Sequence, residues 1–242
     1  MPNPHRACSG YLLNVGESLN LIDCGGGVTS SFLRCGFDPL KLDRIFISHT
    51  HSDHVAELAL FIQMLHVLES GSKLTLFLPS EFVQPFEDYL VAVYLVRERL
   101  SLELEIRDYA DGFVYDGEFR LTAISNMHHA KLAPIIKQLG LPLKMQSHSF
   151  RIEAGGKSLF YSADIGSFED ITDHLDQLDY AIIETTHIPL EQIIEHARSS
   201  SVKQYILTHL GDDNEVSTLQ EQIVESGIRN ITFAEDGMRL EL

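Results

Sequence analysis

Four metal-binding side chains occur within six residues of this chain. The stretch reads His49-Thr50-His51-Ser52-Asp53-His54. Three imidazoles and a carboxylate suit zinc, iron or manganese better than calcium or magnesium, which prefer oxygen ligands. The alternative is a polar loop with chance histidines. Four such residues at this spacing, directly after an apolar segment, favour a transition-metal site.

The flanking residues predict the elements that position this stretch. Residues 44–48 have the β-branched and aromatic content of a buried strand. After the stretch, apolar residues recur at helical spacing: Val55, Leu58, Ala59, Ile62, Leu65 and Leu68. The metal-binding residues should therefore lie in a strand-to-helix loop, where a rigid scaffold can present ligands. If the strand stays extended through His51, that residue and His49 point the same way, because alternate residues share a face.

The pattern His-x-His-x-Asp-His resembles the signature of the metallo-β-lactamase fold hydrolases. In that family a later His, a later Asp and a last His complete two adjacent metal sites. Matching positions are His128 at the end of a strand, Asp164 in Ala163-Asp164-Ile165-Gly166, and His209 in Leu207-Thr208-His209. The residue after His128, His129, should point the other way, toward a pocket.

This resemblance covers nearly the whole chain and implies a specific ligand set. One metal would be held by His49, His51 and His128, and the other by Asp53, His54 and His209, with Asp164 bridging. The implied cofactor is two divalent transition metal ions, zinc first and manganese or iron as alternatives. The implied fold is an α/β, four-layer αβ/βα sandwich of two mixed sheets with helices outside, in one domain spanning residues 1–242.

Three further residues are candidates for the surroundings of the metals. Asp23 ends a strand before Cys24-Gly25-Gly26-Gly27, and the family places a buried carboxylate there that orients metal-bound histidines. A simple turn aspartate is the alternative. His148 could face the pocket, although a surface position is the stronger expectation. Glu184 ends a buried strand and is expected either in the pocket or in contact with a metal ligand.

The same strand end separates this chain from one subgroup of the family. Ribonuclease Z carries His-Glu-Ala-Thr/Ser where this chain has Ile183-Glu184-Thr185-Thr186, so the first His of that element is missing. His187 follows instead, as in the cyclic phosphodiesterase of phosphonate breakdown. The chain also shows no insertion that resembles the tRNA-gripping arm of ribonuclease Z.

Composition limits the possible partners. The chain has 242 residues, 44% of them hydrophobic, with 35 Asp and Glu against 18 Lys and Arg, for a net charge of −17. Because affinity for nucleic acid comes largely from Lys and Arg, we expect a small-molecule substrate and consider long nucleic acid unlikely, although a local basic patch could exist. The start shows no signal peptide, and the three cysteines read as reduced thiols, which indicates a cytoplasmic protein without membrane contact.

The remaining elements follow from periodicity and turn residues. We expect strands at 11–15, 19–23, 74–78, 103–109, 113–115, 119–127, 149–153, 158–162, 179–184 and, with its ligand, 203–210. Helices are expected at 28–34, 81–99 and 214–225, with Pro85 either in the first turns of the second or dividing it in two, and a closing hairpin at 231–234 with 238–242. Residues 130–147 carry three lysines and form either a lid or an ordinary surface helix at 133–140. The first residues resemble a segment that follows a strand in the family. We therefore expect either a true start upstream of Met1 or an open edge of the first sheet, with a homodimer as one consequence.

The expected activity is hydrolysis of a small or cyclic phosphodiester by a hydroxide shared between the metals. Asp53 would take a proton from the water, and His187 would protonate the leaving oxygen. The alternatives are a thioester or lactone hydrolase on the same metals and, outside enzymes, a metal-binding or sensing protein.

Overall fold

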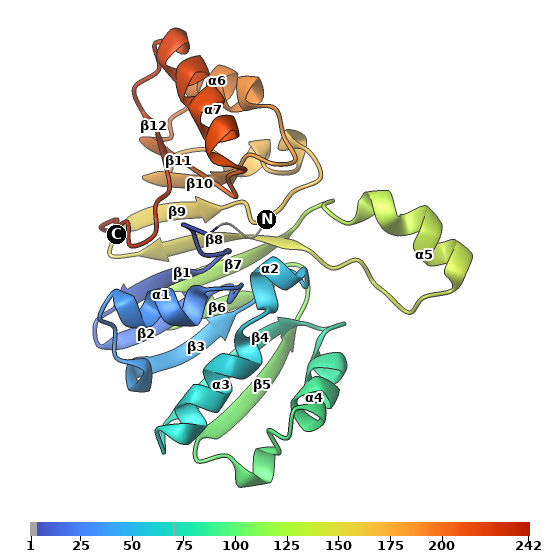
Figure 1. The fold of residues 1–242 in the computed structure, drawn as a ribbon. Coiled ribbons are helices and arrows are strands. Elements are labelled where there is room, and N and C mark those ends of the chain that lie inside the picture. Colours follow the sequence, from blue (N-terminus) through green and yellow to red (C-terminus); the bar gives the residue numbers. More distant parts are fainter. Residues whose placement is uncertain (1–3, 70) are drawn as a thin grey trace. The chain divides into compact units, whose positions relative to one another are not determined.

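The computed structural model describes residues 4–69 and 71–242. The chain divides into two compact units, residues 1–110 and residues 111–242, which are described separately here. Each unit is built on one β-sheet with helices packed on it (Figure 1). The predicted α/β class with two mixed sheets is confirmed, whereas the single domain 1–242 stays a prediction.

The first unit contains a five-stranded sheet in the order β1-β2-β3-β4-β5. Its strands are β1 (Tyr11–Val15), β2 (Ser18–Ile22), β3 (Leu42–Phe46), β4 (Lys73–Pro79) and β5 (Glu103–Tyr109). The hairpin β1–β2 is antiparallel and the other neighbours are parallel. Strand β1 is an edge strand of this sheet, so it is where the expected open edge would lie. Pairing of that edge with another chain stays a prediction.

Among its described residues, the first unit contains four α-helices: α1 (Val28–Arg34), α2 (Ser52–Val55), α3 (Leu58–Val67) and α4 (Val83–Ala92). The apolar faces of α1 and α3 meet in the core, where the rings of Phe32 and Phe61 contact edge to face at 5.2 Å. This cluster also includes Ile45 of β3 and Leu76 of β4, both fully buried. Strand β3 and helix α3 are therefore held in place by this core, and the metal-binding stretch lies between them in the chain.

The second unit contains a seven-stranded mixed sheet in the order β12-β11-β10-β9-β8-β7-β6. Its strands are β6 (Val114–Asp116), β7 (Arg120–Ser125), β8 (His148–Ala154), β9 (Lys157–Tyr161), β10 (Tyr180–Glu184), β11 (Gln204–Thr208) and β12 (Ile231–Phe233). Strands β9 to β12 are parallel, and β6 to β9 are joined antiparallel. Helices α6 (Leu190–Ser199) and α7 (Asp213–Ser226) pack on the parallel part. Candidate residues follow the carboxyl ends of three neighbouring parallel strands, β9, β10 and β11.

Several expected elements differ from those observed. The helix expected over 81–99 ends at Ala92, because Tyr94 adopts a left-handed backbone with φ 63°, and only a 3₁₀ turn follows at Arg97–Arg99. The expected strand 238–242 does not form; instead the carbonyl of Glu241 accepts a hydrogen bond from Lys157 of β9. Helix α6 was not predicted, although Leu190, Ile193 and Ala197 give it a buried face with helical spacing.

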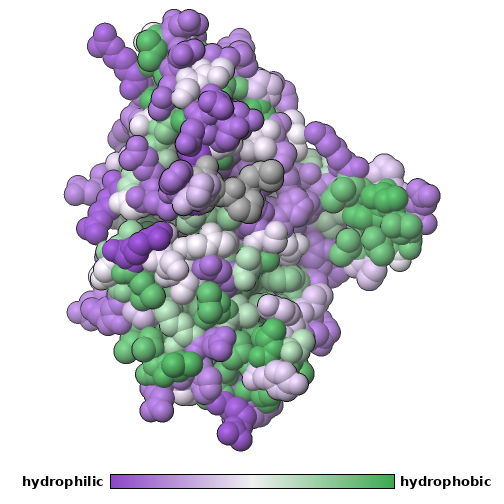
Figure 2. All heavy atoms as spheres, in the orientation of Figure 1, coloured by the Kyte–Doolittle hydropathy of each residue, from purple (hydrophilic) through white to green (hydrophobic). Residues whose placement is uncertain are grey.

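The segment 130–147 forms a 3₁₀ turn (Ala130–Leu132) and helix α5 (Ala133–Leu139), which ends at Gly140 in a left-handed conformation. In Figure 1 it stands away from the sheet of its own unit. The segment exposes five large hydrophobic side chains (Figure 2): Leu132, Ile135, Leu139, Leu141 and Leu143. An ordinary surface helix would keep such residues covered. The lid and surface-helix interpretations both stay predictions.

Among the described residues, no helix is long and apolar enough to cross a membrane.

Candidate metal centre

The first set of candidate ligands lies between β3 and α3. Strand β3 ends at Phe46, two residues before the expected end, and the chain stays extended at His51, which caps α2. The rings of His49 and His51 lie 5.0 Å apart, and those of His49 and His54 lie 4.0 Å apart. Asp53 and His54 are in α2 and also bring ligand atoms within 4.8 Å of each other. All four predicted ligands of this unit are therefore close together.

Asp23 lies beneath these histidines as a fully buried carboxylate. One oxygen accepts the backbone N–H of Ser48 at 2.8 Å. The other accepts the Ser48 hydroxyl at 2.8 Å and lies 2.7 Å from Nδ1 of His54. A carboxylate can only accept here, so Nδ1 of His54 carries the proton and Nε2 is the nitrogen that can bind a metal. Asp23 thus contacts the candidate ligand His54, and its role in orienting a metal-bound histidine stays a prediction.

Ser48 extends the same arrangement to a second ligand. Its hydroxyl donates its only proton to Asp23, and Nδ1 of His49 lies 3.1 Å from the hydroxyl oxygen. The oxygen must accept this hydrogen bond, so His49 is also protonated on Nδ1 and presents Nε2. Ser48 was not predicted, and a serine beside a histidine carries no recognisable sequence signal.

The glycines after Asp23 allow the chain to pass close to the metal-binding stretch. The N–H of Cys24 donates to the carbonyl of His54 at 2.7 Å. A Cβ atom at Gly25 would lie 1.9 Å from the carbonyl oxygen of Asp53, so only glycine fits.

Burial raises the pKa of the Cys24 thiol, with the charges of Glu57 and Asp23 adding to the effect. The thiol is thus protonated and unsuited to bind a metal or act as a nucleophile.

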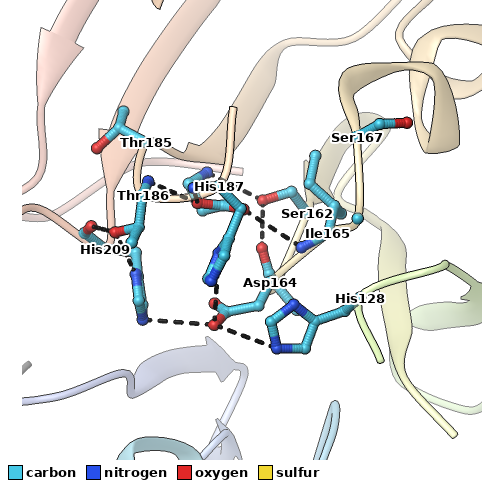
Figure 3. Close-up of polar contacts among 12 residues, drawn as sticks. His128, Ser162, Asp164, Ile165, Ser167, Thr185, Thr186, His187 and His209 are labelled. Atoms are coloured by element: carbon cyan, nitrogen blue, oxygen red, sulfur yellow. Dashed lines mark hydrogen bonds and ion pairs between the residues drawn. The ribbon is translucent and has the colours of Figure 1, made fainter. Parts of the chain in front are cut away.

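The second set of candidate ligands surrounds Asp164 in the other unit (Figure 3). Its Oδ2 lies 3.5 Å from Nε2 of His209 and 3.8 Å from Nε2 of His128. Asp164 follows Ala163, which adopts a left-handed backbone with φ 49°. The strand-end turns thus bring together His128 after β7, Asp164 after β9 and His209 after β11, all three of which were predicted.

The turn after β10 orients His209 through Thr186. The Thr186 hydroxyl donates to the carbonyl of His209 at 2.7 Å and lies 2.7 Å from Nδ1 of the same residue (Figure 3). Because that hydroxyl proton is used, Nδ1 of His209 donates and Nε2 faces Asp164 as a ligand atom. Thr186 is another residue of the candidate site that the sequence did not predict.

His187 lies in the same turn and contacts two carboxylates. Its Nδ1 is 3.0 Å from Oε1 of Glu184 and 4.0 Å from Oδ2 of Asp164. The hydrogen bond with Glu184 raises the pKa of His187, while partial burial opposes this shift. About a third of the His187 side chain (32%) is exposed, against 1% for Glu184. His187 is thus held on one side and open to solvent on the other.

Two other predicted histidines are buried. His129 is 7% exposed, and its ring lies 4.7 Å from that of His128. His148, at the start of β8 opposite Ser125, is 1% exposed. The expectation of a surface position for His148 is therefore wrong. The strand begins one residue earlier than expected, and the new first residue is enclosed by the sheet.

The donor atoms of both sets fit a divalent transition metal. Each unit offers imidazole Nε2 atoms and at least one carboxylate, and neighbouring groups fix the tautomer of three of the histidines. This donor set suits zinc, manganese or iron and does not suit an oxygen-preferring ion. The chain therefore carries a His/Asp set suited to metal binding.

Comparisons with known proteins agree on one family. The beta-lactamase superfamily domain matches residues 20–210. Ribonuclease Z of Methanococcus maripaludis is 22% identical over 100% of this chain and 94% of its own length. Ribonuclease Z of Pyrococcus furiosus is 25% identical over 86% of this chain and 82% of its own length.

Solved structures show the same fold. The metallo-beta-lactamase fold protein YhfI from Bacillus subtilis has a TM-score of 0.74 at 20% identity, over 98% of this chain and 92% of that one. A diphosphatase of the PhnP family has a TM-score of 0.70 at 18% identity, over 100% and 88%. Human tRNase Z, short form, has a TM-score of 0.69 at 16% identity, over 98% and 93%.

These relatives correct the expectation about partners. The prediction of a small-molecule substrate, with long nucleic acid unlikely, is wrong, since the full-length relatives are ribonucleases by name. The prediction relied on a net charge of −17, which is an average over the whole chain. Local composition differs: residues 130–147 hold Lys131, Lys137 and Lys144 and no acidic residue. Net charge alone does not exclude nucleic acid.

Proposed function

Since this chain belongs to the beta-lactamase superfamily and is a metal-dependent hydrolase, we propose that the bond it cleaves is a phosphodiester. The observation that carries this proposal is the match of ribonuclease Z to the entire chain, because RNA is a chain of phosphodiesters. The clustered His and Asp residues of the site support it. Fold likeness alone would not choose the bond.

We assign the ligands by residue. His49, His51 and His128 would hold one divalent ion, Asp53, His54 and His209 the other, and Asp164 both, with zinc as the first candidate and manganese or iron as alternatives. When bound, such ions lower the pKa of a coordinated water and polarise the phosphoryl oxygens.

The chain's own residues would move the protons. Water oxygen bonds to phosphorus while the bond from phosphorus to the leaving oxygen breaks. Asp53 accepts the proton of the attacking water, and His187 donates a proton to the leaving oxygen. The contact with Glu184 and the exposed edge of the ring support this role for His187.

A substrate comparison tests the proposal. Zinc-loaded and manganese-loaded protein is assayed with bis-p-nitrophenyl phosphate, an RNA oligonucleotide, a thioester and a lactone. We expect turnover of the two phosphodiesters. Turnover of the thioester or the lactone alone would overturn the proposal.

His187→Ala tests the assigned proton donor. We expect kcat on RNA to fall about 100-fold, within the usual range for general acid catalysis. The fall should be smaller for p-nitrophenolate, which leaves without protonation. Metal content should not change. Equal losses on both substrates would contradict this role.

A further inference from the structure

One carboxylate joins two turns of the second unit that carry candidate ligands. Oδ2 of Asp170 accepts the backbone N–H of Met127 and the backbone N–H of Gly166, both at 2.9 Å. Met127 directly precedes His128, and Gly166 lies two residues after Asp164. A single side chain outside the ligand set therefore binds the backbone beside two of the candidate ligands.

The two turns also pack directly against each other. A Cβ atom at Gly166 would lie 2.5 Å from the carbonyl oxygen of Met127, so a larger residue would push the turns apart. Asp170 is itself held in the 3₁₀ turn Phe168–Asp170, where it also accepts the N–H of Ser167 at 3.4 Å in a capping box. Its carboxylate thus closes a tight contact from a fixed position.

A second side chain holds the His128 turn from the interior. Asn126 is 7% exposed, and its Oδ1 accepts the N–H of His128 at 3.1 Å while its Nδ2 donates to the Ser149 hydroxyl at 3.2 Å. That hydroxyl donates to the carbonyl of Ser162, two residues before Asp164, at 2.6 Å. The His128 turn is therefore tied to the chain on both sides of Asp164.

These ties set the distance between two side chains that we assign to one ion. Nε2 of His128 lies 3.8 Å from Oδ2 of Asp164 (Figure 3). Two ligand atoms at about 2.1 Å from one zinc ion, at a tetrahedral angle, lie about 3.4 Å apart, so the protein holds this pair near the spacing that a metal needs. Ligands that are already in place bind an ion more tightly, because less conformational freedom is lost on binding.

We propose that Asp170 is a positioning residue for metal binding, whose carboxylate holds the turns of His128 and Asp164 at the spacing of two ligands of one ion. The clamp consists of protein atoms alone, so it acts in the metal-free chain. This inference rests on the ligand assignment of the proposed function and does not depend on which bond is cleaved. The sequence did not indicate it, because the two N–H groups lie 43 and four residues away from Asp170.

Two substitutions separate the clamp from the charge of Asp170. Asp170→Ala removes the acceptor and releases both N–H groups. In Asp170→Asn the amide oxygen can take the place of Oδ2 and still accept from both turns, although these hydrogen bonds are weaker without the charge. If the clamp matters, Asp170→Asn should retain most of the metal affinity that Asp170→Ala loses. If only the negative charge attracts the ion, the two variants should lose equally.

Asp179→Ala is a matched control in the same unit. One oxygen of Asp179 accepts the backbone N–H of Ser158 at 2.9 Å, and the other lies 2.7 Å from Nζ of Lys203. This carboxylate also joins separate segments, but at the amino-terminal ends of β9, β10 and β11, whereas the candidate ligands follow the carboxyl ends. The control measures the cost of losing such a clamp away from the ligands.

The measurements are zinc affinity, by competition with a chromogenic chelator, and Tm with and without zinc. In Asp170→Ala we expect the affinity for one of two ions to fall about tenfold or more, within the range for loss of a residue that orients a metal ligand. Asp170→Asn and Asp179→Ala should stay close to the wild type. The rise in Tm on adding zinc should shrink in Asp170→Ala alone, because the ion stabilises the fold in proportion to its affinity.

His128→Ala identifies the ion that Asp170 affects. It should lose the same binding step, and adding Asp170→Ala to it should weaken the remaining ion little further, because both changes act on one site. Losses that add independently would overturn the proposal.

Other outcomes also decide the matter. If Asp170→Ala binds zinc as tightly as the wild type while its Tm falls equally with and without zinc, Asp170 serves the fold alone and the proposal is wrong. Equal weakening in Asp170→Asn and Asp170→Ala would assign the effect to charge and overturn it as well. A wild type that binds no metal overturns the ligand assignment and this inference together. A wild type that binds metal but cleaves no phosphodiester overturns only the proposed bond, and the affinities still decide this inference.

Discussion

Replacement of Asp23 by asparagine should weaken metal binding through a change of tautomer. The variant keeps the size of the side chain. It also fits the local backbone, because Asp23 has φ 58°, in the left-handed region, which asparagine adopts readily. Its amide oxygen can still accept the N–H of Ser48. Its amide nitrogen, however, would face Nδ1 of His54 and the Ser48 hydroxyl, both of which now donate to the carboxylate.

The magnitude follows from these contacts. With a donor opposite Nδ1, the His54 proton moves to Nε2, the atom that should bind metal. Loss of such an orienting partner typically costs 10–100-fold in metal affinity, which is about 1.4–2.7 kcal/mol. Loss of a charge-assisted hydrogen bond in the buried core should also lower the stability of the metal-free protein by about 1–3 kcal/mol. For a chain of this size that corresponds to a fall in Tm of about 2–12 °C.

Competition with a chromogenic chelator measures the metal affinity, and calorimetry of chelator-treated protein measures the Tm. Asp38→Asn is the control, since Asp38 only caps an exposed 3₁₀ turn through the N–H of Leu40. If Asp23→Asn holds metal as tightly as the wild type while its Tm falls, Asp23 serves the fold alone and the reasoning on tautomers is refuted.

Three further outcomes are expected. Purified without chelator, the protein should contain close to two transition metals per chain by elemental analysis, and His209→Ala should lose one of them preferentially; a protein that neither contains nor responds to any metal contradicts the ligand assignment. Gly25→Ala should unfold at lower temperature and lose metal, because its Cβ would lie 1.9 Å from the carbonyl oxygen of Asp53; Gly26→Ala, whose added Cβ would meet the sulfur of Cys8 at 3.6 Å, an ordinary contact, is the comparison, and an equal effect would contradict the steric explanation. Tyr109→Phe removes the hydroxyl that donates to the carbonyl of Ile47 beside the metal-binding stretch, so the Tm should fall by a few degrees, and an unchanged Tm would mean that this carbonyl finds another donor.

The sequence predicted those parts of the fold that periodicity and residue type determine. Strands such as β4 and β10 are nearly continuous apolar runs because both faces are covered, and their bounds agree with expectation within one residue. The end of α4 was missed because Tyr94 takes a left-handed conformation that its type does not announce. Residues 238–242 have strand-like composition, yet they end beside β9, where Lys157 contacts the chain. Tertiary contacts, and not composition, therefore decide the conformation of residues 238–242.

The candidate ligands could be predicted because four of them are metal-binding residue types within six positions of the sequence. The groups that contact their rings could not be predicted. Four histidines of the candidate site have Nδ1 in contact with another group: His49 with Ser48, His54 with Asp23, His187 with Glu184 and His209 with Thr186. Two of these partners are hydroxyls and lie one and 23 residues away from their histidine, and Asp23 is 31 residues away. No spacing rule connects such pairs, since the fold alone brings them together.

The type of partner also divides these histidines by function. A hydroxyl fixes the tautomer and leaves the ring neutral, which suits a metal ligand, because a ligand must present a lone pair. A buried carboxylate fixes the same tautomer and in addition stabilises positive charge on the ring, which suits a group that gives up a proton. His54 also has a carboxylate partner, Asp23, but its ring is fully buried and has no edge open to solvent. His187 has a carboxylate on Nδ1 and is 32% exposed, which is why we assign it to proton transfer and assign the other three to metal.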